Sequence, residues 1–254
     1  MVPVSVVIVC LDAADTIEKV VEAALLLTDD VIVLDTGSID DTLNKIPPGA
    51  KLINSKWLGF GATKNEGAKL VKYSWVFSLD SDEVISKDLN ESIHSLNFSN
   101  SNTIYSMKRI NYFGDQPILY GEWKNDWVKR IFHKDVALWD LSPVHEKLCF
   151  DKNIQIKKLK GILHHYTTTG FEVYYKKLEA YSNLMAERNF INGKKSSSLK
   201  IYLAPAFNFI KNYIFNLGIL DKSAGWHIAK AHALYTYMKY KKLHQLHRKN
   251  TKDV

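Results

Sequence analysis

The chain opens with two continuous apolar runs on either side of a segment with helical periodicity. Residues 4–10 are almost all β-branched, and a second apolar run covers residues 31–34. Uninterrupted runs of this kind predict strands that are covered on both faces. Residues 16–27 have a helical pattern, and Asp15 followed by Glu18 matches a capping box at its start. The order strand, helix, strand predicts a right-handed βαβ unit.

The alternation of strand and helix continues along the chain. Residues 51–53 and 75–80 predict two further strands, and residues 59–72 predict a helix between them. Later, residues 103–110 and 147–150 also predict strands. We therefore predict an α/β fold, with a mostly parallel central sheet flanked by helices.

The last third of the chain has a different character. Residues 171–189 and 226–246 predict helices, and residues 193–198 resemble a linker. Between them, residues 201–215 are apolar and aromatic but are interrupted by polar positions, so they are too short to span a membrane. This segment could lie in a membrane interface, pack on the domain or pair with a second subunit. We predict a catalytic domain over 1–170, with halves at 1–100 and 101–170, and a helical extension over 171–254.

Composition narrows the class of protein further. The 254 residues carry a net charge of +7, and the basic excess lies late in the chain, which suits an anionic membrane or phosphorylated glycans. Nucleic acid is the weaker partner because no nucleic-acid-binding motif is present. The two cysteines, Cys10 and Cys149, both lie on predicted core strands and suit a reducing compartment. The N-terminus lacks a basic region, so we expect no signal peptide.

The most distinctive polar feature is the acidic stretch Asp80-Ser81-Asp82-Glu83, where the predicted strand 75–80 ends. Three carboxylates in four positions repel one another unless a cation lies between them. Asp80 and Asp82 are two positions apart, which on a strand places both side chains on one face. Mg²⁺ and Mn²⁺ take oxygen ligands and keep waters and phosphates in their shell. The stretch predicts half of a metal–diphosphate site, with a solvated acidic turn as the alternative.

Two other loops carry candidate ligand-binding groups. Asp35 ends the second strand and could accept hydrogen bonds from a uracil or a ribose, while Ser38 and Asp40 could each cap the short helix that follows. Lys64 follows two glycines at the start of a predicted helix, where anions bind. The spacing is not that of a P-loop. Lys64 could therefore reach a phosphate or be a surface lysine.

Four segments together carry a family resemblance. They are Ser5-Val6-Val7-Ile8-Val9, Val33-Leu34-Asp35-Thr36-Gly37-Ser38-Ile39-Asp40-Asp41-Thr42, Thr63-Lys64-Asn65-Glu66-Gly67-Ala68 and Trp75-Val76-Phe77-Ser78-Leu79-Asp80-Ser81-Asp82-Glu83. In this order and spacing, over about the first third of the chain, they resemble family 2 glycosyltransferases of the GT-A fold. The later Ser142-Pro143-Val144-His145-Glu146-Lys147-Leu148 and His165-Tyr166 resemble the subgroup that builds lipopolysaccharide inner core, the β-1,4-glucosyltransferase kind.

The resemblance implies donor-binding roles. Asp35 would contact the nucleobase, Asp12 would lie near the nucleotide, and Lys64 would approach the base or the phosphates. Relatives commonly carry Lys-Asn-Glu where this chain has Cys10-Leu11-Asp12. Lys64 stands where an arginine is frequent, so the charge is kept but the bidentate fork is not.

The resemblance also implies a metal site. Asp80 would face the ribose or the metal, with Ser81 beside it on the donor side, and Asp82 would bind the metal directly. In some GT-A enzymes a late histidine completes the metal shell, which makes His165 a possible ligand. A strand-end histidine bonded to a backbone carbonyl is the alternative. The implied cofactor is a divalent cation, Mg²⁺ or Mn²⁺.

The middle of the chain is expected to bind the acceptor. Trp123 and Trp127 lie among charged residues, Asp126 included. Aromatic rings stack on the faces of sugars while neighbouring polar groups bond their hydroxyls. An aromatic core with a charged rim is the alternative interpretation.

Glu146 is our candidate for the catalytic base. An inverting transfer needs a carboxylate that takes the proton of the acceptor hydroxyl as its oxygen attacks the anomeric carbon. His145 could orient Glu146 or contact the donor phosphates. Asp126 and Glu122 are rival bases, and a polar turn before a strand is the structural alternative.

Together with the resemblance, these observations predict a metal-dependent glycosyltransferase that moves a sugar from a UDP-sugar to a glycolipid or glycan acceptor. The resemblance alone implies inversion, glucose as the best match for the sugar, and the lipopolysaccharide inner core as the acceptor. The alternatives are a peptide or polysaccharide acceptor, a non-catalytic nucleotide-sugar-binding protein, or a nucleotidyltransferase. A nucleotidyltransferase is disfavoured because the glycine-rich N-terminal phosphate loop of that class is absent from this sequence. We expect a cytoplasmic protein. A peripheral position on the inner face of the cytoplasmic membrane and a homo-oligomer stay open.

Overall fold

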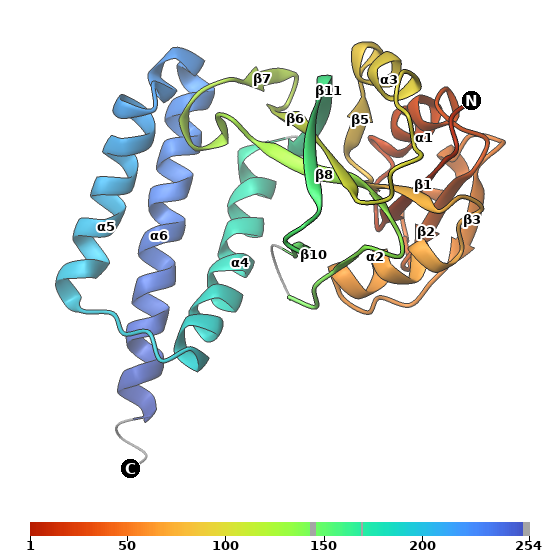
Figure 1. Cartoon of the computed structure of the whole chain (residues 1–254). Coiled ribbons are helices and arrows are strands. Elements are labelled where there is room, and N and C mark those ends of the chain that lie inside the picture. The colour runs from red at the N-terminus through yellow and green to blue at the C-terminus, as the bar shows by residue number, and fades with distance from the viewer. Residues whose placement is uncertain (143–145, 169, 251–254) are drawn as a thin grey trace. The chain divides into compact units, whose positions relative to one another are not determined.

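The computed structural model describes residues 1–142, 146–168 and 170–250. The chain forms two compact units, one from Met1–Ile110 and Asn125–Tyr166, the other from Asn111–Lys124 and Thr167–Val254. Figure 1 draws the helices and strands of both. The assignment of functions to the predicted domains 1–170 and 171–254 stays a prediction.

The first unit contains most of the strands. Its elements are β1 (Val4–Cys10), α1 (Ile17–Leu25), β2 (Val31–Asp35), η1 (Leu43–Lys45), β3 (Lys51–Asn54), α2 (Phe60–Lys69), β4 (Trp75–Asp80), β5 (Glu83–Ile85), α3 (Lys87–His94), β6 (Thr103–Phe113), β8 (Trp127–His133), β9 (Ala137–Trp139), β10 (Leu148–Phe150) and β11 (Gln155–Thr168). The last residues of β6 and β11 belong to the second unit.

The second unit is mainly helical. Its elements are β7 (Gln116–Ile118), η2 (Gly121–Trp123), α4 (Phe171–Ile191), α5 (Ser198–Ile210), the π-helix η3 (Lys211–Phe215), η4 (Gly218–Asp221) and α6 (Lys222–Asn250). In this unit α6 packs against both α4 and α5 (Figure 1). Within the described residues, none of the helices has the length and apolar character needed to cross a bilayer.

The central sheet is mixed rather than mostly parallel. Its strand order is β3-β2-β1-β4-β8-β6-β11-β5. The first four strands pair in parallel, whereas β4–β8, β6–β8 and β5–β11 are antiparallel. The predicted parallel majority is therefore wrong for the second half, because β6 and β8 are joined without a crossover α-helix. The predicted α/β class, a sheet flanked by helices with a helical extension, is confirmed.

The core lies on both faces of the strands that the apolar runs predicted. Val6 and Ile8 of β1 belong to one buried cluster with residues of α1, and Val7 belongs to a second cluster. This alternation explains the uninterrupted apolar run, since both faces of β1 are covered. The prediction for Cys149 is wrong, because Cys149 is exposed on the short strand β10 while Cys10 is buried.

Several helix boundaries differ from the prediction. The capping box is wrong: α1 begins at Ile17, and its N-cap residue Thr16 makes no side-chain cap hydrogen bond. Instead the hydroxyl of Thr16 donates to the carbonyl oxygen of Ser81 at 2.8 Å, which ties the start of α1 to the acidic stretch. Helix α2 ends at Lys69 rather than at residue 72, and α6 begins at Lys222 rather than at residue 226.

A close approach at Gly67 places α2 against the sheet. A Cβ at Gly67 would lie 2.4 Å from Cγ1 of Val7 and 2.8 Å from Cδ1 of Leu34. We expect Gly67→Val to lower the free energy of unfolding by about 2 kcal/mol or more, because the core cannot take the extra methyl groups without shifting. Urea unfolding measures this change. Glu66→Ala, an exposed neighbour, should change little, and equal stability of the two variants would contradict the close packing.

Candidate active site

Three parallel strands deliver acidic residues to one edge of the sheet. In the register of these strands Asp35 pairs with Cys10, two positions before Asp12, and Asp80 pairs with Val9. The carboxyl ends of β1, β2 and β4 therefore meet at this edge, which is where ligands bind in open α/β sheets.

The loops after β1 and β2 are joined through Asp12 and Asp35. The carboxylate of Asp35 is buried and accepts hydrogen bonds from the amides of Gly37 (3.0 Å) and Ser38 (3.2 Å). Asp12 has a positive φ of 49° and accepts a hydrogen bond from the amide of Ile39 at 2.8 Å. Both carboxylates thus shape the loop 36–42. Their roles toward a nucleotide stay predictions.

The predicted capping by Ser38 and Asp40 takes a different form. The short helix η1 begins at Leu43 with Thr42 as its N-cap residue. The hydroxyl of Ser38 donates to Asp35 at 2.5 Å, so Ser38 serves the loop rather than the helix. Asp40 accepts from the amide of Thr42 at 3.0 Å and from its hydroxyl. Capping by Ser38 is therefore wrong, because its hydroxyl is held by the nearer carboxylate.

Each polar position in the motif that opens α2 has a structural partner. The Asn65 amide donates to the carbonyl of Trp139 and accepts from its backbone N–H, both at 2.9 Å, which fastens α2 to β9. Thr63 accepts from the amide of Leu58 at 3.2 Å. Together with the close approach at Gly67, these contacts hold Lys64 in a fixed, buried position.

Lys64 joins two candidate functional carboxylates. Its Nζ lies 2.7 Å from Oδ1 of Asp80 and 2.7 Å from Oε1 of Glu146. The Lys64 side chain is 2% exposed, and its Nζ lies 4.8 Å from the centre of the Trp139 ring. Lys64 is therefore not the surface lysine of the alternative interpretation. The structure brings together Lys64, Asp80 and Glu146, which are far apart in the sequence.

The ion-pair chain continues from Asp80 through Arg130 and Arg109, two residues that the sequence interpretation did not select. Arg130 lies 2.6 Å from Oδ2 of Asp80 and 2.5 Å from Oε1 of the buried Glu83. Arg109 lies 2.8 Å from the same Glu83 oxygen and 2.8 Å from Asp126. One sequence signal could have identified Arg130. It is a charged residue next to the apolar Ile131 and Phe132 in a segment with a strand pattern.

These contacts set the ionisation of the network. Partial burial of Asp80 opposes ionisation, but the charges of Arg130 and Lys64 outweigh it and hold the pKa of Asp80 well below its usual range. Burial likewise opposes the charge of Arg130, yet Asp80 and Glu83 raise its pKa further. Asp80 and Arg130 are therefore both charged at neutral pH.

Arg130→Met should lower the free energy of unfolding at neutral pH by about 3 kcal/mol, because Asp80 and Glu83 lose a buried partner. Arg130 and Lys64 lower the pKa of Asp80 in the folded state, so the stability they provide is present above pH 3.8, the ordinary value. That stability is lost as the pH falls through and below this value. The difference in the free energy of unfolding between the variant and the parent should therefore become smaller at acidic pH. Urea unfolding across a pH series tests this.

A matched control separates this result from a general effect of losing a positive charge. Lys72 forms an exposed pair with Asp29, with side chains 51% and 42% exposed. Lys72→Met should change stability little, since exposed ion pairs contribute little. If the loss of stability in Arg130→Met were the same at neutral and acidic pH, the stabilisation could not come from these ion pairs.

Asp82 and His165 form the pair that best suits a divalent cation. Oδ2 of Asp82 lies 3.3 Å from Nε2 of His165, and their side chains are 27% and 14% exposed. Strand pairing of β5 with β11 places His165 opposite Glu83. A carboxylate oxygen and an imidazole nitrogen at this distance suit Mn²⁺ or Mg²⁺ when phosphate oxygens and waters complete the shell. Both oxygens of Asp80 have cationic partners, Lys64 and Arg130.

No group of three or more His, Cys, Asp or Glu side chains suited to a metal ion occurs in the described part of the chain. A cation at Asp82 and His165 would therefore depend on ligands from the donor diphosphate. The roles of Asp80, Asp82 and His165 in metal binding, and of Ser81 in donor binding, stay predictions.

The two predicted acceptor tryptophans belong to different units. Trp127 is 37% exposed at the start of β8, and Nζ of Lys158 lies 4.4 Å from the centre of its ring. Trp123 lies in the second unit, where its ring packs against Tyr174 at 5.7 Å between centroids. This packing agrees with the alternative interpretation of Trp123, in which its ring is part of an aromatic core.

Glu122 and His145 are the two remaining candidate residues. Glu122, a rival base, lies in the second unit, where its carboxylate is 2.8 Å from Nδ1 of His232 and accepts from Asn212 at 3.0 Å. His145, which we expected to orient Glu146, lies outside the described residues. Its role stays a prediction.

Comparisons with known proteins agree with the resemblance seen in the sequence. The chain is 27% identical over 226 residues to an uncharacterized glycosyltransferase of Rickettsia prowazekii, covering 84% of this chain and 77% of that protein. It is 25% identical over 256 residues to the lipopolysaccharide core biosynthesis glycosyltransferase LpsC of Rhizobium meliloti, covering 96% and 93%.

Among solved structures, glucosyl-3-phosphoglycerate synthase from Mycobacterium tuberculosis, in complex with Mn²⁺, UDP-glucose and phosphoglyceric acid, matches with a TM-score of 0.34. The match has 22% identity over 42% of this chain and 43% of that one.

The model of the family described as glycosyl transferase family 2 matches residues 5–169, which is more than half of the chain. The chain therefore belongs to glycosyl transferase family 2 and is a glycosyltransferase.

Proposed function

We propose that this glycosyltransferase moves a sugar, with glucose the best match, from UDP to a glycan of the lipopolysaccharide inner core, with inversion at the anomeric carbon. The observation that carries the proposal is the contact of Lys64 with both Asp80 and Glu146 at the carboxyl edge of the sheet. Similarity to LpsC over 96% of the chain supports the acceptor class. Such a glycan is carried by a lipid, so we place the enzyme at the cytoplasmic face of a membrane.

The donor end of the site would be built by four residues. Asp82 and His165 would hold a divalent cation, which supplies charge neutralisation for the leaving diphosphate. Lys64 and Arg130 bring two further positive charges to the end of β4. Because both are buried and fixed by ion pairs, their charge is in place before the reaction and costs no reorganisation.

Glu146 would act as the base at the acceptor end. Its Oε1 is held 2.7 Å from Nζ of Lys64, and a carboxylate is a group that can accept a proton. As the acceptor oxygen attacks the anomeric carbon, its proton passes to Glu146 and the bond from the anomeric carbon to the UDP oxygen breaks. The shared ammonium would also link the position of the base to that of Asp80.

A transfer assay tests the donor and acceptor classes together. The protein is incubated with Mn²⁺, a lipopolysaccharide core acceptor truncated before its hexose branch, and UDP-glucose, UDP-galactose, GDP-mannose or dTDP-glucose in turn. We expect one hexose to be added from a UDP-sugar, read as a mass shift of the acceptor. Addition from GDP-mannose or dTDP-glucose alone would contradict the donor assignment, and transfer to a peptide or free polysaccharide alone would contradict the acceptor.

A further inference from the structure

Helix α5 in the second unit exposes most of its large apolar side chains, although Ile201 is buried. The outer face of α5 is defined by residues at helical spacing that continue into η3: Leu199, Leu203, Phe207, Ile210 and Ile214. Leu203 is 58% exposed and Phe207 is 66% exposed. Exposed apolar side chains extend beyond this helix through the following turn: Phe215, Leu217, Ile219 and Leu220. A contiguous apolar surface of this extent marks an interaction site rather than ordinary solvent-facing surface.

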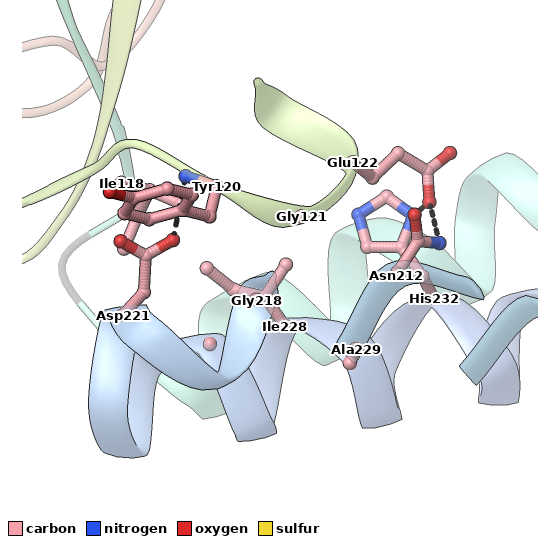
Figure 2. Close-up of a pocket in the computed structure, with 11 residues that line it drawn as sticks. Ile118, Tyr120, Gly121, Glu122, Asn212, Gly218, Asp221, Ile228, Ala229 and His232 are labelled. Atoms are coloured by element: carbon pink, nitrogen blue, oxygen red, sulfur yellow. Dashed lines mark hydrogen bonds and ion pairs between the residues drawn. The ribbon is translucent and has the colours of Figure 1, made fainter. Parts of the chain in front are cut away.

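The opposite face of α5 and η3 combines the buried Ile201 with three amide side chains. Asn212 is buried, and its amide donates to Asn208 at 3.3 Å and to Glu122 at 3.0 Å. The side-chain amide of Asn216 donates to Oδ1 of Asn212 at 2.9 Å. Figure 2 shows the Asn212 side chain directed toward Glu122. Amides therefore occupy much of the inner face, while most of the large apolar side chains lie outside, which is unusual for a helix in a water-soluble bundle.

The segment that contains this face has a large excess of basic residues. Residues 189–250 contain eleven Lys or Arg residues and a single acidic residue, Asp221. The Asp221 carboxylate is buried and accepts from the amides of Leu119 (3.2 Å) and Tyr120 (2.9 Å), so it does not offset the surface charge. Lys200 and Lys211 are exposed and directly follow Leu199 and Ile210, which places them along one edge of the outer face.

Aromatic side chains with polar edges lie in the same region. Tyr202 is 67% exposed on α5. Trp226 is 45% exposed and packs edge-on against Tyr213 at 5.3 Å between centroids. Tyrosine and tryptophan at this position, next to lysines and large apolar groups, are typical of helices that lie at headgroup depth.

We propose that the outer face of α5 lies in the interfacial region of a bilayer that contains anionic lipid, parallel to its plane. The apolar side chains would enter the acyl boundary, and Lys200 and Lys211 would extend to the phosphate groups. A second copy of this chain fits the surface less well, because two such faces would bring two strongly positive helical units together. This inference does not depend on the transfer reaction, so its test and the transfer assay can fail separately.

Vesicle sedimentation of the full-length protein tests the proposal. We expect binding to phosphatidylcholine vesicles only when they contain phosphatidylglycerol, and weaker binding at high salt. The double variant Leu203→Gln/Phe207→Gln should lower the partition coefficient about a hundredfold, since two large apolar groups no longer leave water. Lys200→Gln/Lys211→Gln should lower it about tenfold or more, on anionic vesicles alone.

A matched control removes an exposed leucine from the other unit. Leu26 is 76% exposed at the end of α1, and Leu26→Gln should leave vesicle binding unchanged. Circular dichroism checks that each variant is folded. Equal binding of the Leu203→Gln/Phe207→Gln variant and the parent would overturn the proposal. So would a parent dimer in light scattering that becomes a monomer in this variant while neither binds vesicles.

Discussion

Replacing Asp82 with alanine is expected to abolish metal-dependent turnover while the fold stays intact. The Asp82 carboxylate lies 3.3 Å from His165, and in our account these two side chains are the protein ligands of the divalent cation. Without the carboxylate, the diphosphate would lose the neutralisation of its developing charge, a contribution of several kcal/mol to the transition state. We expect a loss of turnover of at least about a thousandfold, measured as release of UDP from the sugar donor at saturating Mn²⁺.

A control in the same region makes this result specific. Asp88→Ala removes an exposed carboxylate in the first turn of α3 and should leave turnover near that of the parent. Thermal unfolding should be similar for the two variants. Turnover of the Asp82→Ala variant at the level of the Asp88→Ala variant would contradict the metal assignment, as would full activity of the parent in excess chelator.

Replacing Glu146 with glutamine is expected to lower turnover by about a hundredfold to ten-thousandfold while UDP binding is kept. Glutamine keeps the size of the side chain and can still accept a hydrogen bond from Lys64 through its amide oxygen, so the ion-pair chain should change little in geometry. It cannot take the proton of the acceptor hydroxyl. Steady-state kinetics should show a fall in kcat with little change in the donor KM.

The rival base Asp126 provides the comparison for Glu146. Asp126 lies in the same unit and is bonded to Arg109 at 2.8 Å, so Asp126→Asn is a change of the same kind in a similar environment. Our account expects a much smaller loss of turnover for Asp126→Asn than for Glu146→Gln. Near-normal turnover of Glu146→Gln together with a large loss for Asp126→Asn would move the base to Asp126.

The sequence predicted the first half of the fold well because local and global signals agree there. The strands β1, β2 and β4 are covered on both faces, so their apolar runs are continuous and their ends are marked by Cys10, Asp35 and Asp80. The sheet as a whole was predicted as mostly parallel, but in its second half β8 pairs antiparallel with both β4 and β6. Strand direction there depends on how the chain returns between strands, which no local pattern contains.

The candidate site was predicted in part for a related reason. Asp80, Lys64 and Glu146 were each selected from their own segments, but their contact through one ammonium depends on the tertiary structure. Arg130 was missed because a buried ion pair contributes one residue to each of two distant strands, and Arg130 has no recognisable motif by itself. Its partner Glu83 was noted only as part of the acidic stretch.

The capping box and Trp123 show the opposite error, in which a plausible local pattern was overruled by tertiary contacts. Asp15 and Glu18 have capping-box spacing, yet α1 begins after Thr16, whose hydroxyl is bonded to Ser81. Trp123 lies among charged residues in the sequence, yet its ring packs against Tyr174 of α4. Side-chain partners that are distant in the sequence decided both outcomes.

The measurement that tests the central claim most directly is calorimetric binding of UDP with and without Mn²⁺, in the parent and in the Asp82→Ala variant. Our account predicts tight binding by the parent only when Mn²⁺ is present, and loss of that metal-dependent binding in the variant. Equal UDP binding with and without Mn²⁺, or unchanged metal-dependent binding in Asp82→Ala, would contradict a metal–diphosphate site at the end of β4.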